Sequence, residues 1–212
     1  MTPVRSISSS RVDGWPEARD SPEVQEPAPQ TTVAEYLELD AKAAGKLELL
    51  NGVVVAMAGA SPRHNQIVTN VAFALNAVLR EGPCRVFSQD QRVQVEATES
   101  YVYPDIVVVC AEPSFDTSAR PASLRNPSAV VEVLSRSTLD LDLGAKLGHY
   151  RRMPSVREVL LVHAEERAVT TVSRQDDGSW KLVDTGPGGA VELSGVPLSL
   201  DTIYERTESL PA

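Results

Sequence analysis

A strand, helix and strand pattern between Ala129 and His163 constrains the fold of this chain more than any other feature. The runs AVVEVL and REVLLVH predict two buried strands. Between them, Ser137 or Thr138 can cap a helix that runs to about Arg152. This order of elements is typical of a crossover unit, in which a helix covers the sheet that holds both strands.

The remaining patterns add hairpins and helices to this unit. Tight turns are expected at Asn51-Gly52 and at Asp176-Asp177-Gly178, each between two apolar runs. Ser61 and Pro62 begin a helix whose apolar residues recur at helical spacing until Gly82. The other expected elements are a helix capped by Thr32 that runs to about Leu39, the strands RVFS, RVQVE and DIVVVC, a loop from Glu112 to Asn126, and a helix that Asp201 caps and that runs to about Glu205. Helices against a mixed, mostly antiparallel sheet indicate an α/β or α+β fold.

Composition limits the classes of protein to consider. Residues 1–30 are rich in Ser, Pro, Glu and Gln, which predicts a disordered tail before one domain at residues 31–212. The formal charge of −9 excludes a polybasic protein that holds nucleic acid by bulk charge. Two cysteines are too few for a disulfide framework, so we expect a cytoplasmic protein in a reducing compartment. No apolar run is long enough to predict a membrane span.

Two carboxylates and a lysine indicate chemistry. Glu132 interrupts an apolar strand, where an ionised carboxylate is costly unless a cation or strong donors meet it. Asp105 opens the apolar run of another strand, and two carboxylates on neighbouring strands can share Mg²⁺ or Mn²⁺. The backbone carbonyl of Val133 could add a further metal ligand. Lys146, in the following helix, could orient an attacking water. This combination predicts metal-dependent cleavage of phosphodiester bonds.

A structure without catalysis fits the same residues. Asp105, after a proline, could simply open a strand. Glu132 could form a buried ion pair with Lys146 or Arg136 and have no other role. The residue types alone leave both interpretations open.

Local charge bears on where a nucleic acid would bind. Residues 120–157 hold seven Lys and Arg against three Asp and Glu, in a chain whose net charge is −9. We call this segment the positive strip, and Arg136, Arg151 and Arg152 are its candidate DNA contacts. A solvated helix face and loop is the alternative interpretation.

Four segments resemble a known family. They are LELLNGVVV, SPRHNQIVTNVAFAL, YPDIVVVC and VVEVLSRSTLDLDLGAKLGHYRRMPSVREVLLV. Over residues 31–206 the chain resembles the Uma-two family of restriction-endonuclease type, within the PD-(D/E)XK nuclease superfamily. The resemblance implies a restriction-endonuclease-like fold, with a mixed central sheet flanked by helices, and assigns Asp105 and Glu132 as the two acids. The superfamily has a lysine two residues after the second acid, where this chain has Leu134, so Lys146 would be a migrated catalytic lysine.

The resemblance extends to supporting residues. Glu48 could be a third acid near the metal or a charge at a strand edge. His64 begins the long helix and could contact substrate, or simply cap the helix or lie at the surface. Asp142 and Tyr150 lie four residues before and after Lys146, so we expect Asp142 to share its helix face and Tyr150 to pack or to support the lysine.

Two functions of different classes follow. The first is a Mg²⁺- or Mn²⁺-dependent endonuclease acting on DNA, with a homodimer expected from the resemblance to restriction enzymes. The second is a non-catalytic module that keeps the nuclease fold and binds nucleic acid or protein. The acidity of the chain favours the module, because a nuclease must hold a phosphate backbone.

Overall fold

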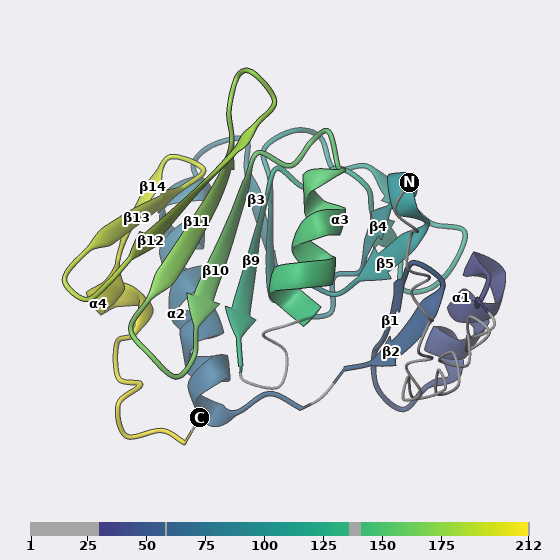
Figure 1. Ribbon diagram of the computed structural model, residues 1–212, viewed down its shortest axis with the longest axis horizontal. Helices are drawn as coiled ribbons and strands as arrows, with labels where there is room; N and C mark the ends of the chain where they lie inside the picture. The colour runs from purple at the N-terminus through teal and green to yellow at the C-terminus, as the bar shows by residue number, and fades with distance from the viewer. Residues whose placement is uncertain (1–29, 58, 136–140, 212) are drawn as a thin grey trace, which may run out of the picture.

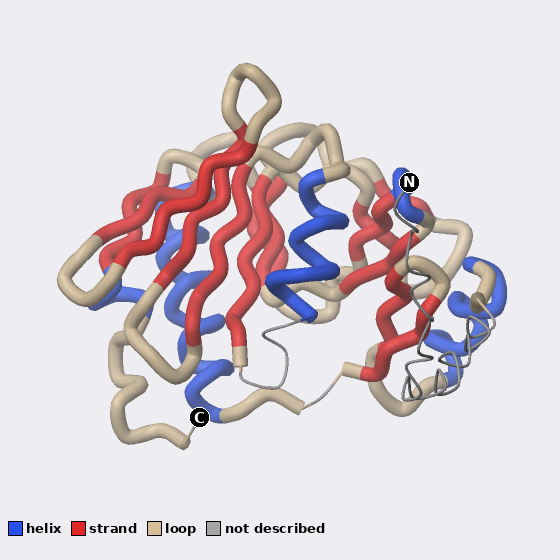
Figure 2. Tube along the Cα trace, in the orientation of Figure 1, coloured by secondary structure: helices blue, strands red, loops and turns tan. Residues whose placement is uncertain are grey.

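The structure, a computed structural model, describes residues 30–57, 59–135 and 141–211, and the side chains of all of these except 141–143. Residues 1–29 of the predicted tail lie outside this range, and so do the predicted helix caps Ser137 and Thr138. The described residues form two six-stranded sheets, a separate two-stranded hairpin and helices that pack against them. Figure 1 shows the elements in order, and Figure 2 shows the two sheets separated by the helix α3.

The first sheet, which we call the central sheet, has the strand order β12, β11, β10, β9, β6, β3. Its strands are β3 (Arg85–Ser88), β6 (Ile106–Val109), β9 (Ala129–Leu134), β10 (Glu158–His163), β11 (Val169–Arg174) and β12 (Trp180–Thr185). The neighbours β9 and β10 are parallel, and every other adjacent pair is antiparallel. The π-helix η2 (Leu141–Lys146) and the helix α3 (Leu147–Arg151) connect the parallel pair, so the predicted crossover unit is confirmed.

The second sheet has the strand order β2, β1, β5, β4, β8, β7. Its strands are β1 (Leu47–Leu50), β2 (Val53–Ala56), β4 (Val93–Val95), β5 (Ser100–Val102), β7 (Phe115–Asp116) and β8 (Ser123–Leu124), with a 3-10 turn η1 (Glu96–Thr98) between β4 and β5. The prediction of a continuous loop from Glu112 to Asn126 is wrong, because β7 and β8 pair there. Strands of two residues lack the alternation on which a sequence-based strand prediction depends.

The central sheet is covered on both faces. One core joins it to α2 (Pro62–Leu79), α4 (Leu200–Ile203) and the hairpin of β13 (Ala190–Leu193) and β14 (Val196–Ser199). The other core joins it to α3 and the second sheet. Alternate residues of β9 follow this division, since Val131 and Val133 lie in the first core and Val130 and Leu134 in the second. Glu132 therefore points toward α3.

Local sequence signals position several of these elements. The predicted hairpin turn is confirmed, with positive φ angles of 50° at Asn51 and 81° at Gly52. The helix α1 (Val33–Lys42) begins at Thr32, which forms the predicted capping box with Glu35. For α4, the predicted cap Asp201 is wrong. The cap is Ser199, two residues earlier, whose hydroxyl accepts the N–H of Thr202. None of the helices described is long and apolar enough to cross a membrane.

The two cysteines form a disulfide that their number and spacing did not predict. Cys84 and Cys110 lie 26 residues apart, with an S–S distance of 2.04 Å. They come together because β3 and β6 are antiparallel neighbours, with Arg85 opposite Val109, so the next positions face each other. Disulfides persist mainly in oxidising compartments, so this bond does not support the argument from cysteine number, and the cytoplasmic location stays a prediction.

Candidate functional site

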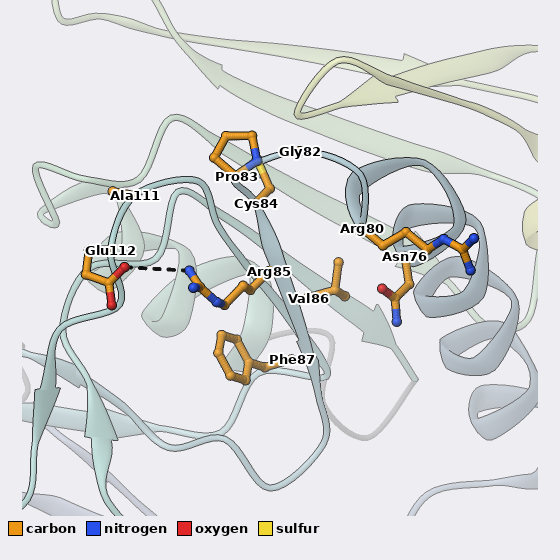
Figure 3. Close-up of a pocket in the computed structure, with 10 residues that line it drawn as sticks. All are labelled: Asn76, Arg80, Gly82, Pro83, Cys84, Arg85, Val86, Phe87, Ala111 and Glu112. Atoms are coloured by element: carbon orange, nitrogen blue, oxygen red, sulfur yellow. Dashed lines mark ion pairs between the residues drawn. The ribbon is translucent and has the colours of Figure 1, made fainter.

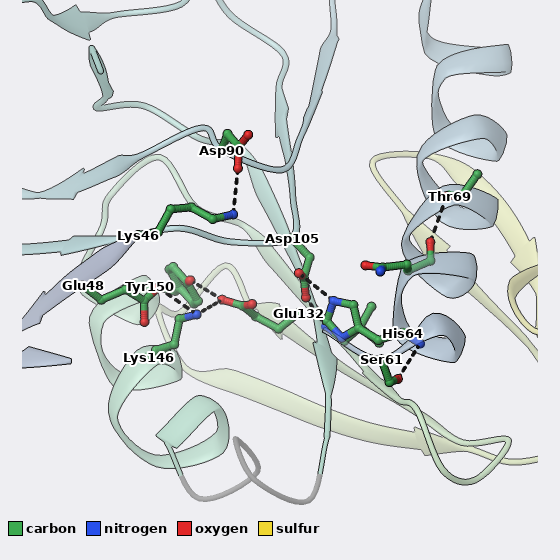
Figure 4. Close-up of polar contacts among 12 residues, drawn as sticks. Lys46, Glu48, Ser61, His64, Thr69, Asp90, Asp105, Glu132, Lys146 and Tyr150 are labelled. Carbon is green, nitrogen blue, oxygen red and sulfur yellow. Dashed lines mark hydrogen bonds and ion pairs between the residues drawn. The ribbon is translucent and has the colours of Figure 1, made fainter. Parts of the chain in front are cut away.

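A buried ion cluster joins the two sheets through Lys146. The Nζ atom of Lys146 lies 2.9 Å from Oε1 of Glu132 and 3.1 Å from Oε1 of Glu48 (Figure 4). Glu132 comes from β9 of the central sheet, Glu48 from β1 of the second sheet, and Lys146 from the end of η2. All three side chains are at most 4% exposed. The expectation that a positive group faces Glu132 is therefore met by Lys146.

Tyr150 fixes the orientation of Glu132. Its hydroxyl donates a hydrogen bond of 2.5 Å to Oε1 of Glu132, the same oxygen that contacts the ammonium group of Lys146. Lys146 and Tyr150 are four residues apart in η2 and α3 and so present both groups to the strand. Through this hydrogen bond, Tyr150 supports the acid directly.

Asp105 lies at the edge of the same region. It directly precedes β6, which is antiparallel to β9, and its Oδ2 atom accepts the backbone N–H of Val133 at 2.8 Å. Its Oδ1 atom is 3.0 Å from Nε2 of His64 in the first turn of α2. The side chains of Asp105 and His64 are 18% and 14% exposed, respectively. This carboxylate is therefore the more accessible of the predicted acids.

The sequence did not single out Tyr103, which contacts the site through its backbone. Its N–H donates a hydrogen bond of 2.7 Å to Oε1 of Glu48. Tyr103 follows β5 directly, and Asp105 directly precedes β6, so the segment 103–105 leads from the second sheet to the central sheet. The only sequence signal was its position two residues before Asp105.

The remaining predicted residues lie elsewhere or outside the described part. Arg151 and Arg152 lie at the C-terminal end of α3, and Arg151 lies 5.8 Å above the ring of Trp180. Lys146 lies at the opposite end of this helix. Arg136 and the side chain of Asp142 lie outside the described residues, so their predicted roles stay predictions.

The chemistry of the donors fits a hard divalent cation. Asp105, Glu132 and Glu48 offer carboxylate oxygens, the ligands that Mg²⁺ and Mn²⁺ prefer in proteins. Among the described side chains, the two glutamates share the one ammonium group of Lys146. Among the described residues, no group of three or more His, Cys, Asp or Glu is arranged so that it could hold a metal ion. Asp105 and Glu132 would hold the ion together with water or substrate oxygens.

A buried histidine lies beside the cluster on α3. His149 Nδ1 is 2.8 Å from the hydroxyl of Thr98 in η1, and its side chain is 1% exposed. Its Nε2 atom is buried, and no described residue forms a hydrogen bond with it. Burial, together with the nearby positive charge of Arg152, lowers the pKa of His149. A pKa lowered from the ordinary value of 6.5 favours the neutral form of this histidine near pH 7.

A separate surface pocket of about 670 Å³ lies at the C-terminal end of α2 (Figure 3). Arg85 and Glu112 face each other across it at 3.9 Å, and Cys84 of the disulfide also lines it. His64 begins α2, whereas the pocket is lined by Asn76 and Arg80 near its end. None of the predicted site residues lines this pocket.

Comparison with known proteins gives matches over most of the chain. The model of the Uma2 family, described as "Putative restriction endonuclease", matches residues 33–202. Two uncharacterized proteins from Synechocystis sp. are similar in sequence. The protein sll1609 is 34% identical over 77% of this chain and 92% of its own length. The protein slr1290 is 31% identical over 84% of this chain and 93% of its own length.

A crystal structure shows the same fold. It is a "putative nuclease belonging to DUF820" from Anabaena variabilis, and it matches with a TM-score of 0.65. The match covers 83% of this chain and 98% of that protein, at 18% sequence identity. At this identity the likeness shows the fold alone.

Proposed function

Because the chain belongs to the Uma2 family, whose model matches residues 33–202, we propose that it is a metal-dependent endonuclease that hydrolyses phosphodiester bonds in DNA. One observation carries this proposal. Lys146 lies within 2.9 Å of Glu132, in a cluster that also holds Glu48 and adjoins Asp105 through the amide of Val133. Two acids on neighbouring strands can hold a metal ion, and a lysine beside them can orient the attacking water for phosphodiester hydrolysis.

In this proposal each group has a distinct role. Asp105 and Glu132 hold Mg²⁺ or Mn²⁺, and the backbone carbonyl of Val133 is a further candidate ligand. When bound, the metal stabilises negative charge on the phosphate. Lys146 orients the attacking water, and Tyr150 keeps the carboxylate of Glu132 turned toward the lysine. Glu48 is the third acid, and His64 holds Asp105 through the contact of its Nε2 atom with Oδ1.

Cleavage of supercoiled plasmid tests the proposal. We expect nicking with Mg²⁺ or Mn²⁺ and none with Ca²⁺, and we expect Asp105→Asn and Lys146→Ala each to reduce the rate at least about a hundredfold. The matched controls are Asp201→Asn and Lys181→Ala, which change exposed residues away from the cluster. Undiminished cleavage in both site variants would assign the activity to a contaminant or another site.

A second function, a non-catalytic module for nucleic acid or protein, is favoured by one observation. Lys146 is 3% exposed and already held by two carboxylates, which is how a purely structural ion cluster is built. Titration of Mn²⁺ separates the two functions, because a metal that binds the folded state raises the melting temperature. We expect a rise that Glu132→Gln abolishes. A flat response at millimolar Mn²⁺ would favour the module.

We also propose that the enzyme acts as a homodimer, because two copies of the site, one for each strand, would let it cut both strands of a duplex together. Sedimentation of the purified chain measures this directly, and a monomer at micromolar concentration with intact double-strand cleavage would remove the dimer from the proposal.

A further inference from the structure

A second buried ion pair lies beside the site and contacts the segments that carry two of its acids. Asp40, near the C-terminal end of α1, accepts the backbone N–H of Leu47 at Oδ1, over 3.0 Å. Its Oδ2 atom accepts the hydroxyl of Tyr103 at 2.6 Å and Nη1 of Arg92 at 2.8 Å. Leu47 precedes Glu48 in β1. One carboxylate therefore holds both the strand of Glu48 and the residue whose amide contacts Glu48.

Arg92 holds this carboxylate from the other side. Its Nε atom donates to Oγ of Ser123 at 2.8 Å, and its Nη2 atom donates to the carbonyl of Pro121. The side chains of Arg92 and Asp40 are 1% and 2% exposed. Because each group has fixed partners and no solvent, the pair can adopt few other arrangements.

The backbone of Leu47 is held on both sides. Its N–H donates to Asp40, and its carbonyl accepts the hydroxyl of Tyr36 over 2.8 Å. Both partners belong to α1, so this helix fixes the beginning of β1. Glu48 is the next residue, and its position therefore depends on α1.

The site needs this kind of support because its acids come from different sheets. Glu48 belongs to the second sheet and Glu132 to the central sheet, and the segment 103–105 leads from one to the other. Tyr103 is held at both ends, by the carboxylate of Glu48 at its N–H and by Asp40 at its hydroxyl. A shift between the sheets would separate Glu48 from Lys146.

We propose that Asp40, Arg92 and Tyr103 are positioning residues that fix β1 and the segment 103–105, and with them the acids Glu48 and Asp105, at the active site. This inference rests on the proposed nuclease function, since it assigns the network to the geometry of that reaction. None of the three supplies a group to the chemistry. They keep Glu48 and Asp105 where Lys146 and the metal need them, and displacement of a reacting group by about 1 Å can reduce a rate about a hundredfold.

The variant Tyr103→Phe tests the proposal because it removes one hydroxyl and keeps the ring and the backbone N–H. The matched control is Tyr204→Phe, which removes a buried hydroxyl that donates to the carbonyls of His163 and Ala168. We expect kcat for plasmid nicking to fall about tenfold or more in Tyr103→Phe, with KM and DNA binding in Ca²⁺ unchanged. The control should retain the wild-type kcat.

Amide hydrogen exchange gives a readout that does not require cleavage. We expect faster exchange at Leu47 and at position 103 in Tyr103→Phe, beyond what its melting temperature explains, and no such change in Tyr204→Phe. Ser123→Ala removes one hydrogen bond of Arg92 and should speed exchange at the same amides by a smaller factor. It provides a second variant if Tyr103→Phe fails to fold.

The outcomes separate this inference from the proposed function. Unchanged exchange at these amides would overturn the positioning role whatever the activity, and so would equal losses of kcat in Tyr103→Phe and its control. If the wild type does not cleave DNA, the proposed function fails, and the exchange data alone decide whether the network holds the strand of Glu48.

Discussion

The protein contains two buried ion clusters of nearly equal exposure, and they differ in how charge is balanced. Asp40 and Arg92 form a pair of one carboxylate and one guanidinium, with the remaining donors of Arg92 directed at Ser123 and Pro121. Lys146 instead serves two carboxylates, Glu48 and Glu132. Counted over these described side chains alone, the first pair is formally neutral, whereas the second group has two carboxylates for one ammonium.

Charge balance, rather than burial, separates a structural ion pair from a candidate site. A neutral, fully bonded pair is complete, and its main effect is to fix the surrounding backbone. An anionic cluster in low dielectric has a reason to bind a further cation, and such clusters concentrate at functional sites. Burial alone does not distinguish the two clusters, because their charged side chains are all at most 4% exposed.

The largest effect is expected for Lys146→Met. The substitution leaves two buried carboxylates without their cation, so we expect a loss of about 3–5 kcal/mol in the free energy of unfolding and no detectable cleavage. Mn²⁺ should restore part of the lost stability, because the ion can replace the ammonium charge. Urea denaturation with and without Mn²⁺ measures the loss of unfolding free energy and the part that the ion restores. A variant as stable as the wild type would show that these carboxylates do not depend on the lysine.

Arg92→Met should cost a similar amount, about 3–5 kcal/mol, because it leaves Asp40 buried without its partner. Arg92→Met should differ from Lys146→Met in how much Mn²⁺ stabilises the variant. We expect Mn²⁺ to give this variant no more stabilisation than it gives the wild type. A specific rescue of Arg92→Met by Mn²⁺ would remove the distinction between a complete cluster and one that accepts a cation.

The smallest effect concerns His149, a neutral group between α3 and the second sheet. Its folded-state pKa is lowered, so protonation favours the unfolded chain. Its contribution to stability is therefore present above the unfolded pKa of about 6.5 and is lost as the pH falls toward the lowered folded value. We expect the wild type to lose more stability than His149→Gln between pH 7 and pH 5. Melting curves at pH 8 provide the control, since there the difference between the two proteins should no longer change with pH.

The sequence predicted the parts of the structure that depend on local signals. The Asn51-Gly52 turn, the caps of α1 and α2 and the crossover of β9 and β10 all follow from neighbouring residues. The contact of Glu132 with Lys146 was also expected, because an isolated buried acid needs a cation within reach.

Contacts that depend on sheet register could not be predicted. Glu48 contacts Lys146 from β1, whose place in the second sheet is set by its pairing with β5, where Leu49 lies opposite Tyr101. The role of Asp40 could not be predicted either, because its partner Arg92 is 52 residues away in the sequence. The strands β13 and β14 were missed because their segment is short and interrupted by Gly195 and Pro197.

The crossover unit also determines which parts of the site are inherited together. Glu132, Lys146 and Tyr150 all lie within the contiguous segment 129–163, so recombination with breakpoints outside this segment transfers them as one block. Glu48 lies far upstream, so a breakpoint between residues 48 and 129 would bring it from the other parent. A chimera could therefore receive an intact acid and lysine pair and still lack a correctly placed third carboxylate. For Glu48 to keep its position in such a chimera, β1 and α1 must come from the same parent, because α1 fixes the start of the strand.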